Sequence, residues 1–150
     1  MHRVPMYSLR MPGTTKTPAR TLESTDHWDL AVRRSVSRIF LLAALAERPM
    51  HGYELAQAVA ELSGECCAPS DASLYPALRE LTEGGYITCA VEARGNRRRN
   101  VCTLTDRGRE ALAAAAASWG RVLPHLADVI ERAPKPGTIE KHETKHEIEE

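Results

Sequence analysis

Residues 70–105 read SDASLYPALRELTEGGYITCAVEARGNRRRNVCTLT, and this stretch decides how the chain around it can fold. Leucines recur at helical spacing from residue 74 to residue 81, which predicts a helix with one apolar stripe. Gly84-Gly85 ends that helix. Two runs of alternating apolar and polar residues then flank Gly95-Asn96, the pattern of a β-hairpin. The stretch therefore predicts a helix followed directly by a hairpin.

The start of this helix has two candidate caps, Ser70 and Ser73. Pro76 lies a few residues further on. Proline is tolerated in the first turn of a helix and disrupts later turns. We therefore expect Ser73 to be the cap.

The hairpin strands are expected over residues 86–93 and 100–105. Centring the turn on Gly95-Asn96 sets Cys89 opposite Cys102, and the alternation of the two strands agrees with this register. One face of the hairpin is then apolar and can pack on helices. That face consists of Ile87, Cys89, Cys102 and Leu104.

Two further helices precede this stretch. The first starts after Ser24 or Thr25 and ends at Arg48-Pro49. Its section 39–45 is apolar on every side, which places it in the middle of the core. A second, shorter helix with one apolar stripe covers about residues 52–62. Three helices and a hairpin in this order indicate a winged helix-turn-helix, a fold that is mainly α with a small β-hairpin.

A long last helix follows Thr105 and runs from Asp106 to about Arg132. Its apolar residues step by four and three, the heptad pattern of a helix that pairs with another helix. We therefore expect a C-terminal dimerisation helix, bent near Pro124. The alternative is that the stripe packs back on its own domain. The stripe consists of Leu112, Ala116, Trp119, Leu123, Leu126 and Ile130.

The chain divides into four parts on this interpretation. Residues 1–23 form a disordered arm, 24–105 the winged helix-turn-helix domain, 106–133 the dimerisation helix and 134–150 a charged tail. The tail contains His142-Glu143-Thr144-Lys145-His146, which matches the H-E-x-x-H zinc-protease motif by its letters. It lacks the packed helix and third ligand of such a site, so we expect no enzyme, no metal site and no cofactor.

The formal net charge of the chain is +0, so any nucleic-acid partner must be held by locally concentrated positive charge. No signal peptide or membrane span is recognisable, and we expect a cytoplasmic protein without membrane contact. Four cysteines in such a chain are expected to be reduced thiols.

Positive charge is indeed concentrated at the hairpin tip. A basic hairpin of this kind can lie over the DNA backbone or enter the minor groove, and the polar edge of the preceding helix suits phosphate and base contacts. The helix offers Ser70, Ser73, Tyr75 and Arg79, and the hairpin tip offers Arg94, Arg97, Arg98 and Arg99. We interpret these residues as the contacts to double-stranded DNA.

Four motifs then occur in order. They are His51-Gly52-Tyr53-Glu54-Leu55, Ser73-Leu74-Tyr75-Pro76-Ala77-Leu78, the arginine-rich hairpin, and Leu104-Thr105 with Gly108-Arg109. With them the chain resembles the PadR family of transcriptional regulators over about residues 36–112. The resemblance implies a homodimer that binds an inverted-repeat operator, usually a repressor relieved by a small molecule. It adds Tyr53 to the DNA contacts. Val101-Cys102 departs from the family, whose members often carry two tyrosines there.

A second resemblance concerns Ser118-Trp119-Gly120-Arg121-Val122. This segment is similar to the one that lines a pore at the dimer interface of multidrug-sensing members. The resemblance implies that Trp119, Gly120 and Val122 bind a planar aromatic or cationic effector, which suits stacking on an indole face. Alternatively, Trp119 only packs the dimer core.

Two alternatives to a ligand-responsive repressor remain. Cys66-Cys67 is a vicinal pair and Cys89 faces Cys102, so a thiol- or metal-responsive regulator could use the same scaffold. A winged-helix module that binds proteins and never DNA is the other.

Overall fold

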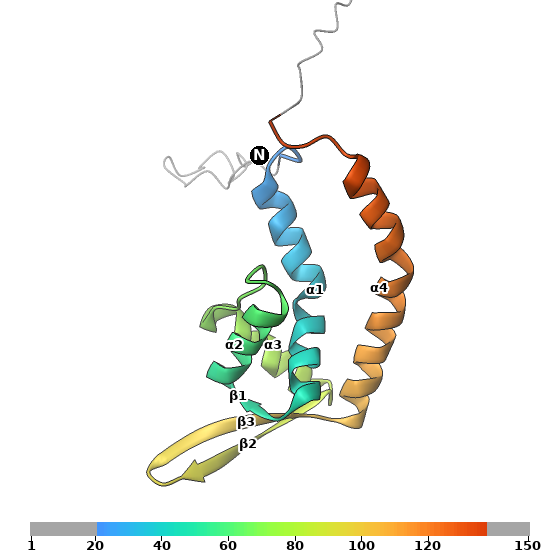
Figure 1. Cartoon of the computed structure of the whole chain (residues 1–150). Helices are drawn as coiled ribbons and strands as arrows, with labels where there is room; N and C mark the ends of the chain where they lie inside the picture. The colour runs from blue at the N-terminus through green and yellow to red at the C-terminus, as the bar shows by residue number, and fades with distance from the viewer. Residues whose placement is uncertain (1–20, 138–150) are drawn as a thin grey trace, which may run out of the picture.

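The structure, a computed structural model, describes residues 21–137 of the chain. In that range four helices and a three-stranded sheet follow one another in the order α1, β1, α2, α3, β2, β3, α4 (Figure 1). The helices are α1 (Thr25–Glu47), α2 (Gly52–Leu62), α3 (Asp71–Glu83) and α4 (Asp106–Arg132). The strands are β1 (Met50–His51), β2 (Ile87–Arg94) and β3 (Arg97–Leu104). The predicted mainly helical fold with a small winged sheet is confirmed. The predicted arm falls mostly, and the H-E-x-x-H motif entirely, outside the described residues.

The core lies where the second half of α1 meets α2, α3 and the base of the sheet. Ala44 of α1 and Leu55 of α2 have no exposed surface, and Leu74 of α3 is 2% exposed. Ile87 and Leu104, from the base of the hairpin, complete the cluster. The apolar section predicted for the middle of the core is therefore the part of α1 that the other elements cover.

Helices α1, α2 and α4 have the predicted bounds because their ends carry recognisable signals. Thr105 begins α4 as a side-chain cap: its hydroxyl accepts a hydrogen bond from the Gly108 N–H at 3.1 Å. The same hydroxyl donates to the carbonyl of Gly85 at 2.7 Å, which ties α4 to the turn after α3.

The predicted start of α3 is wrong. The helix begins at Asp71 with Ser70 as the cap residue, so Pro76 lies inside the helix. Ser73 supports the earlier start because its hydroxyl accepts from the Ser70 N–H at 3.1 Å, which is half of a capping box. This local bonding outweighs the single backbone hydrogen bond that Pro76 cannot make.

The sheet has the strand order β1-β3-β2, so β3 lies in the middle. The predicted register is confirmed: Cys89 is opposite Cys102, and Ile87 is opposite Leu104. Pairing extends further than predicted, because β3 already begins at Arg97 rather than at residue 100. The sequence interpretation missed β1, whose two residues pair with Val101 and Cys102 of β3.

Two helices extend beyond the small domain. Figure 1 shows the first half of α1 and the second half of α4 projecting past α2 and α3. Both carry exposed apolar side chains, among them Trp28 on α1 and Ile130 on α4, which are 53% and 64% exposed. Leu112, predicted as a dimer residue, is partly buried against the core of its own domain. Within residues 21–137, every helix is too short or too polar to cross a lipid bilayer.

Candidate nucleic-acid interface

A cleft of about 810 Å³ lies between α2, α3 and the sheet. Four of the predicted DNA contacts line it: Tyr53 from α2, Tyr75 and Arg79 from α3, and Arg99 from β3. The fold thus gathers residues that are up to 46 positions apart in the sequence (99 − 53) around one opening. The opening is bounded by α3 on one side and by the hairpin on the other.

The two tyrosines stand at the mouth of this cleft. Tyr53 is 71% exposed and Tyr75 is 56% exposed. The Tyr53 hydroxyl accepts a hydrogen bond from Gln57 Nε2 at 3.1 Å, which orients the ring. A Cβ atom built on Gly52 would lie 3.5 Å from the Tyr75 hydroxyl oxygen, so Tyr75 rests beside the start of α2. Both hydroxyls can donate to a phosphate in the cleft.

Ser70 and Ser73 lie outside this cleft. They line a separate hollow of about 460 Å³ between α1 and α3, together with Arg33 and Arg34 of α1. Both serines are exposed at the start of α3, where helix N–H groups lack intrahelical partners and suit an anion. The structure therefore separates the predicted helix contacts into two groups, one on each side of α3.

Arg79 is exposed on α3 and lines the cleft. The adjacent Glu80 accepts a hydrogen bond from Arg38 of α1 at 2.6 Å. Among residues 21–137, no carboxylate forms an ion pair with Arg79. The exposed guanidinium can therefore reach a phosphate or a guanine edge without breaking an internal contact.

The hairpin tip carries positive charge that the rest of the described chain does not neutralise. Arg94 is directly opposite Arg97 in the ladder, and like charges opposite each other destabilise a sheet. Within residues 21–137, neither these two nor Arg98 has an ion-pair partner. Arg98 alternates with Arg97 and Arg99, so arginines project from both faces of the hairpin. An external polyanion would relieve this repulsion.

Arg99 is held by a contact that sequence reasoning missed. Its guanidinium lies 2.8 Å from Nε2 of His51, which caps α2 by accepting the Glu54 N–H at Nδ1. Nε2 also lies 2.7 Å from the Glu54 carboxylate. His51 belongs to the HGYEL motif, but only the tyrosine of that motif was assigned a role. The imidazole joins the start of α2 to the wing.

Glu54 is the electrostatic centre of that contact. The hydrogen bond from Arg48 lowers the pKa of its carboxyl below the ordinary value of 4.5, and the neighbouring His51 lowers it further. Burial opposes the shift but does not reverse it. Glu54 is therefore ionised at neutral pH, and its charge is shared by Arg48 and His51.

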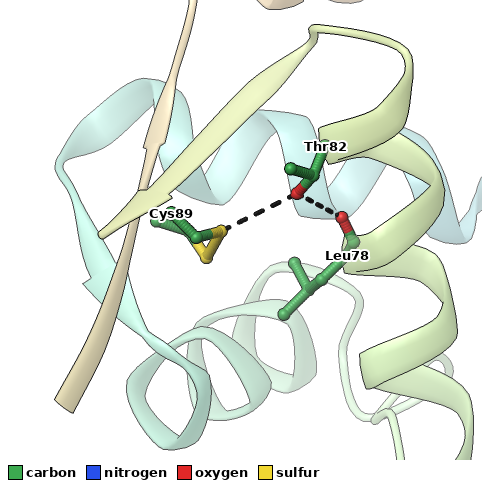
Figure 2. The surroundings of a disulfide bond; sticks show 4 residues. Leu78, Thr82 and Cys89 are labelled. Carbon is green, nitrogen blue, oxygen red and sulfur yellow. Dashed lines mark hydrogen bonds between the residues drawn. A yellow bond between two sulfur atoms is a disulfide. The ribbon is translucent and has the colours of Figure 1, made fainter. Parts of the chain in front are cut away.

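Cys89 and Cys102 are joined by a disulfide bond, with Cα atoms 4.0 Å apart. The expectation of four reduced thiols is wrong for this pair, because the register sets the two side chains directly opposite on the inward face. Both residues line the cleft. Figure 2 shows the sulfur of Cys89 facing Thr82 of α3, whose hydroxyl also bonds to the Leu78 carbonyl.

Cys66 and Cys67 remain free thiols in the loop after α2. Cys66 is exposed and Cys67 is buried, with their sulfur atoms 3.8 Å apart. Burial, and then the neighbouring Cys66, raise the pKa of the Cys67 thiol. Across residues 21–137, no three His, Cys, Asp or Glu side chains gather as metal ligands.

The predicted effector residues lie on the exposed part of α4. Trp119 is half-buried, and Trp119 and Val122 line a small hollow of about 160 Å³ with Ser118. Gly120 does not line that hollow, and a Cβ built on it meets nothing within 4 Å. Two of the three predicted residues are therefore together. The other heptad residues beyond Leu112 stay exposed, from Ala116 to Ile130.

Comparison with known proteins agrees with this architecture. Residues 41–114 match the sequence model described as the transcriptional regulator PadR-like family. A padr family transcriptional regulator from Eggerthella lenta shares 24% identity and a TM-score of 0.60, covering 72% of this chain and 93% of its own. A transcriptional regulator from Clostridium thermocellum shares 21% identity and a TM-score of 0.60, covering 67% of this chain and 98% of its own. These two likenesses concern the fold.

A similar protein is also carried by a mobile element. An uncharacterized 37.1 kDa protein in transposon TN4556 of Streptomyces fradiae is 37% identical over 91 residues, or 61% of this chain. The match covers 25% of that protein, so the present chain spans about a quarter of its length.

Proposed function

Because this chain belongs to the PadR-like family of transcriptional regulators, we propose that it is a sequence-specific DNA-binding repressor that acts as a homodimer. The observation that carries the proposal is the set of exposed arginines without carboxylate partners in residues 21–137. Arg79 of α3 lines the cleft, and Arg94, Arg97 and Arg98 lie further out on the wing. This charge accounts for a polyanionic partner although the formal net charge is +0.

In the proposed complex, α3 enters the major groove and the wing lies over the neighbouring backbone or minor groove. The intervening phosphates then fall at the mouth of the cleft, beside Tyr53 and Tyr75. Ser70 and Ser73 contact phosphates on the far side of α3, where Arg33 and Arg34 add charge. Two subunits would read half-sites about one helical turn apart.

Replacing Arg97, Arg98 and Arg99 together by Ala tests the wing. We expect weaker binding to every duplex, and a slope of log affinity against log salt that is shallower by about 0.9 for each lost phosphate contact. Fluorescence anisotropy over a salt series, with a duplex from upstream of the protein's own gene and a scrambled duplex, measures both. A matched variant that loses three exposed arginines of α4, Arg107, Arg121 and Arg132, separates the wing from general charge.

Two outcomes would contradict the proposal. If the wing variant binds all duplexes as well as the wild type, the wing is not a DNA contact. If neither protein binds any duplex, a winged-helix module for protein partners becomes the better interpretation.

Dimerisation is supported by the apolar surface of the two projecting helices. Val122, Leu123 and Leu126 of α4 are 47%, 50% and 40% exposed in the single chain. Trp28, Leu30 and Val32 of α1 are exposed to a similar degree. Large apolar side chains exposed along projecting helices favour an interaction surface. A second copy supplies a matching face for each helix.

The effector site is proposed at Trp119. The half-buried indole and the hollow beside Val122 lie on the face that dimerisation would double, so a planar aromatic cation could stack between two indoles. Trp119→Ala should abolish binding of ethidium, a planar cationic dye, as measured by dye fluorescence. Val129→Ala removes an exposed apolar side chain of the same helix outside the heptad stripe and should bind the dye as the wild type does. Equal loss in both variants would remove Trp119 as the site.

A further inference from the structure

We propose that Cys89 and Cys102 form a peroxide-reactive dithiol at the root of the wing, whose oxidation fixes the wing against α3 and strengthens DNA binding. The chemical part stands on the geometry of the cysteine pair alone. The effect on affinity rests on the proposed DNA-binding function.

The position of the pair in the sheet is the first argument. Moving outward from the core, Ile87 opposite Leu104 is the first inward-facing pair of the hairpin, and Cys89 opposite Cys102 is the second. The next inward position, Val91 opposite Asn100, is already exposed on both strands. The disulfide therefore lies where the wing leaves the body of the domain.

The two cysteines are anchored differently. Cys102 is 2% exposed and belongs to the central strand β3, where it also pairs with Met50 of β1. Cys89 is partly buried and belongs to β2, the edge strand of the sheet. The disulfide thus joins the edge strand β2, near its start, to the central strand β3.

Contact with α3 links this bond to the reading helix. The Cys89 sulfur lies 3.9 Å from the Thr82 hydroxyl oxygen, and that hydroxyl is fixed by a 2.7 Å hydrogen bond to the Leu78 carbonyl (Figure 2). Residues 91–100 are exposed throughout, so the wing is held at its root and, further out, by the contact between Arg99 and His51. Duplex binding needs α3 and the wing at a fixed separation. A wing held at that separation before binding loses less conformational freedom when DNA arrives.

Hydrogen peroxide can oxidise the two thiols to a disulfide in two steps. Both cysteines line the open cleft, so a small hydroperoxide reaches them from solvent. The Cys89 thiolate attacks one peroxide oxygen, the O–O bond breaks, and after protonation a sulfenic acid and one water result. The Cys102 sulfur then attacks the Cys89 sulfur, an S–S bond forms, the S–O bond breaks, and the second water leaves with the thiol proton. Two thiols and one hydrogen peroxide give one disulfide and two waters.

In a reducing environment, the disulfide between Cys89 and Cys102 would form only after exposure to an oxidant. A DNA-binding regulator works where cellular thiols are kept reduced, and disulfides in such compartments are usually transient and redox-sensing. The reduced pair is then the resting state and the disulfide is the state after oxidant exposure. Excess small thiol returns the pair to the reduced state by exchange.

The test compares the full-length protein in two redox states. Reduced protein is treated with hydrogen peroxide, quenched with catalase, and titrated into the fluorescent duplexes described above beside an untreated reduced sample. We expect the oxidised form to bind about three- to tenfold more tightly, the size of effect that ordering one or two groups in advance produces. Peptide mapping should show the cross-link between Cys89 and Cys102.

Two variants localise the effect. Cys89→Ala should bind equally before and after peroxide, with the affinity of the reduced wild type. Cys66→Ser removes an exposed thiol from the other pair and should keep the full response. A response that survives in Cys89→Ala, or disappears in Cys66→Ser, would place the sensor in the loop and overturn the proposal.

The comparison of reduced with oxidised wild-type protein does not depend on whether any substituted protein folds. Equal affinity in both redox states, with the cross-link formed, would overturn the clamp while leaving DNA binding intact. Absence of binding in either state would overturn the proposed DNA-binding function and the clamp with it. The cross-link measurement still decides whether the pair reacts with peroxide. If peroxide leaves the two thiols free, the dithiol itself is refuted.

Discussion

One imidazole ring holds the wing to the second helix. Nε2 of His51 lies within hydrogen-bonding distance of both Arg99 and the Glu54 carboxylate. With Nδ1 accepting the Glu54 N–H, the neutral ring carries its proton on Nε2 and donates it to the carboxylate. Accepting from Arg99 at Nε2 requires the proton on Nδ1 instead, so the Arg99 tether and the α2 cap need different tautomers of the ring.

Glu54 should make stability depend on pH in a defined direction. Its pKa is lower in the folded chain than the ordinary 4.5, so its contribution is present above pH 4.5 and is lost as the pH falls through the lowered value. Glu54→Gln should cost less than about 1 kcal/mol at pH 7, as expected for a partly exposed pair, and less at pH 3 than at pH 7. Urea unfolding at both pH values measures the difference.

Glu61→Gln is the control for this prediction. Glu61 lies on the same helix, is exposed, and has no ion pair within residues 21–137. Its replacement should leave the pH profile of stability unchanged. Identical profiles for the two variants would show that the Arg48 and His51 contacts do not stabilise the Glu54 charge.

At the scale of the element, the two glycines of α4 should respond oppositely to a methyl group. A Cβ on Gly108 would lie 2.2 Å from the Tyr86 carbonyl oxygen and 2.4 Å from Leu104 Cδ1, so Gly108→Ala should destabilise by about 1–3 kcal/mol. A Cβ on Gly120 meets nothing within 4 Å, and alanine is the better helix former. Gly120→Ala should therefore stabilise by about 0.5–1 kcal/mol.

Thermal unfolding of the two variants, run side by side, tests this pair. A Gly108→Ala change that does not destabilise would mean that α4 does not pack closely through Gly108, and a Gly120→Ala change that destabilises would mean that Gly120 does not face open space. The two stability changes also distinguish the first turns of α4, which contact the core, from the part of the helix that projects beyond it.

The elements could be predicted where a local signal was strong. The bounds of α1, α2 and α4 followed from apolar periodicity and from capping residues such as Thr105, and the hairpin register followed from Gly95-Asn96. The start of α3 could not be predicted from Pro76 alone, because the bonding between Ser70 and Ser73 opposed it. Strand β1 has two residues and no periodicity, so only the packing of the finished sheet defines it.

Only those parts of the candidate site that depend on local sequence could be predicted. The cluster of arginines around the predicted turn was enough to predict a DNA contact from the sequence alone. The separation of Ser70 and Ser73 from the cleft, the His51 tether and the disulfide depend on distances between elements. A register can set Cys89 opposite Cys102, but it does not say whether the two sulfur atoms are bonded.

At the scale of the whole molecule, the projecting parts of α1 and α4 should determine assembly. Leu126→Glu places a charge in the face of α4 through which we propose that two copies pair, so we expect the variant to be a folded monomer. Affinity for an inverted-repeat duplex should fall about a hundredfold, because the second half-site is no longer held at high effective concentration. Sedimentation velocity gives the mass, and anisotropy gives the affinity.

His125→Glu is the matched control, since it adds the same charge at the adjacent exposed position outside the heptad stripe. It should remain a dimer with nearly unchanged DNA affinity. A dimeric Leu126→Glu protein would show that the subunits meet elsewhere.

The arginines of the wing have a consequence for how the molecule approaches its target. A chain with a formal net charge of +0 experiences no overall pull toward a polyanion at long range. Its charge is nevertheless unevenly placed, with cations at the tip of one hairpin that form no ion pair in the part of the chain that the structure describes. The electric field of a duplex would orient such a protein with its wing toward the DNA before the two come into contact. Orientation would then precede contact, and added salt would slow the search by letting the molecule tumble.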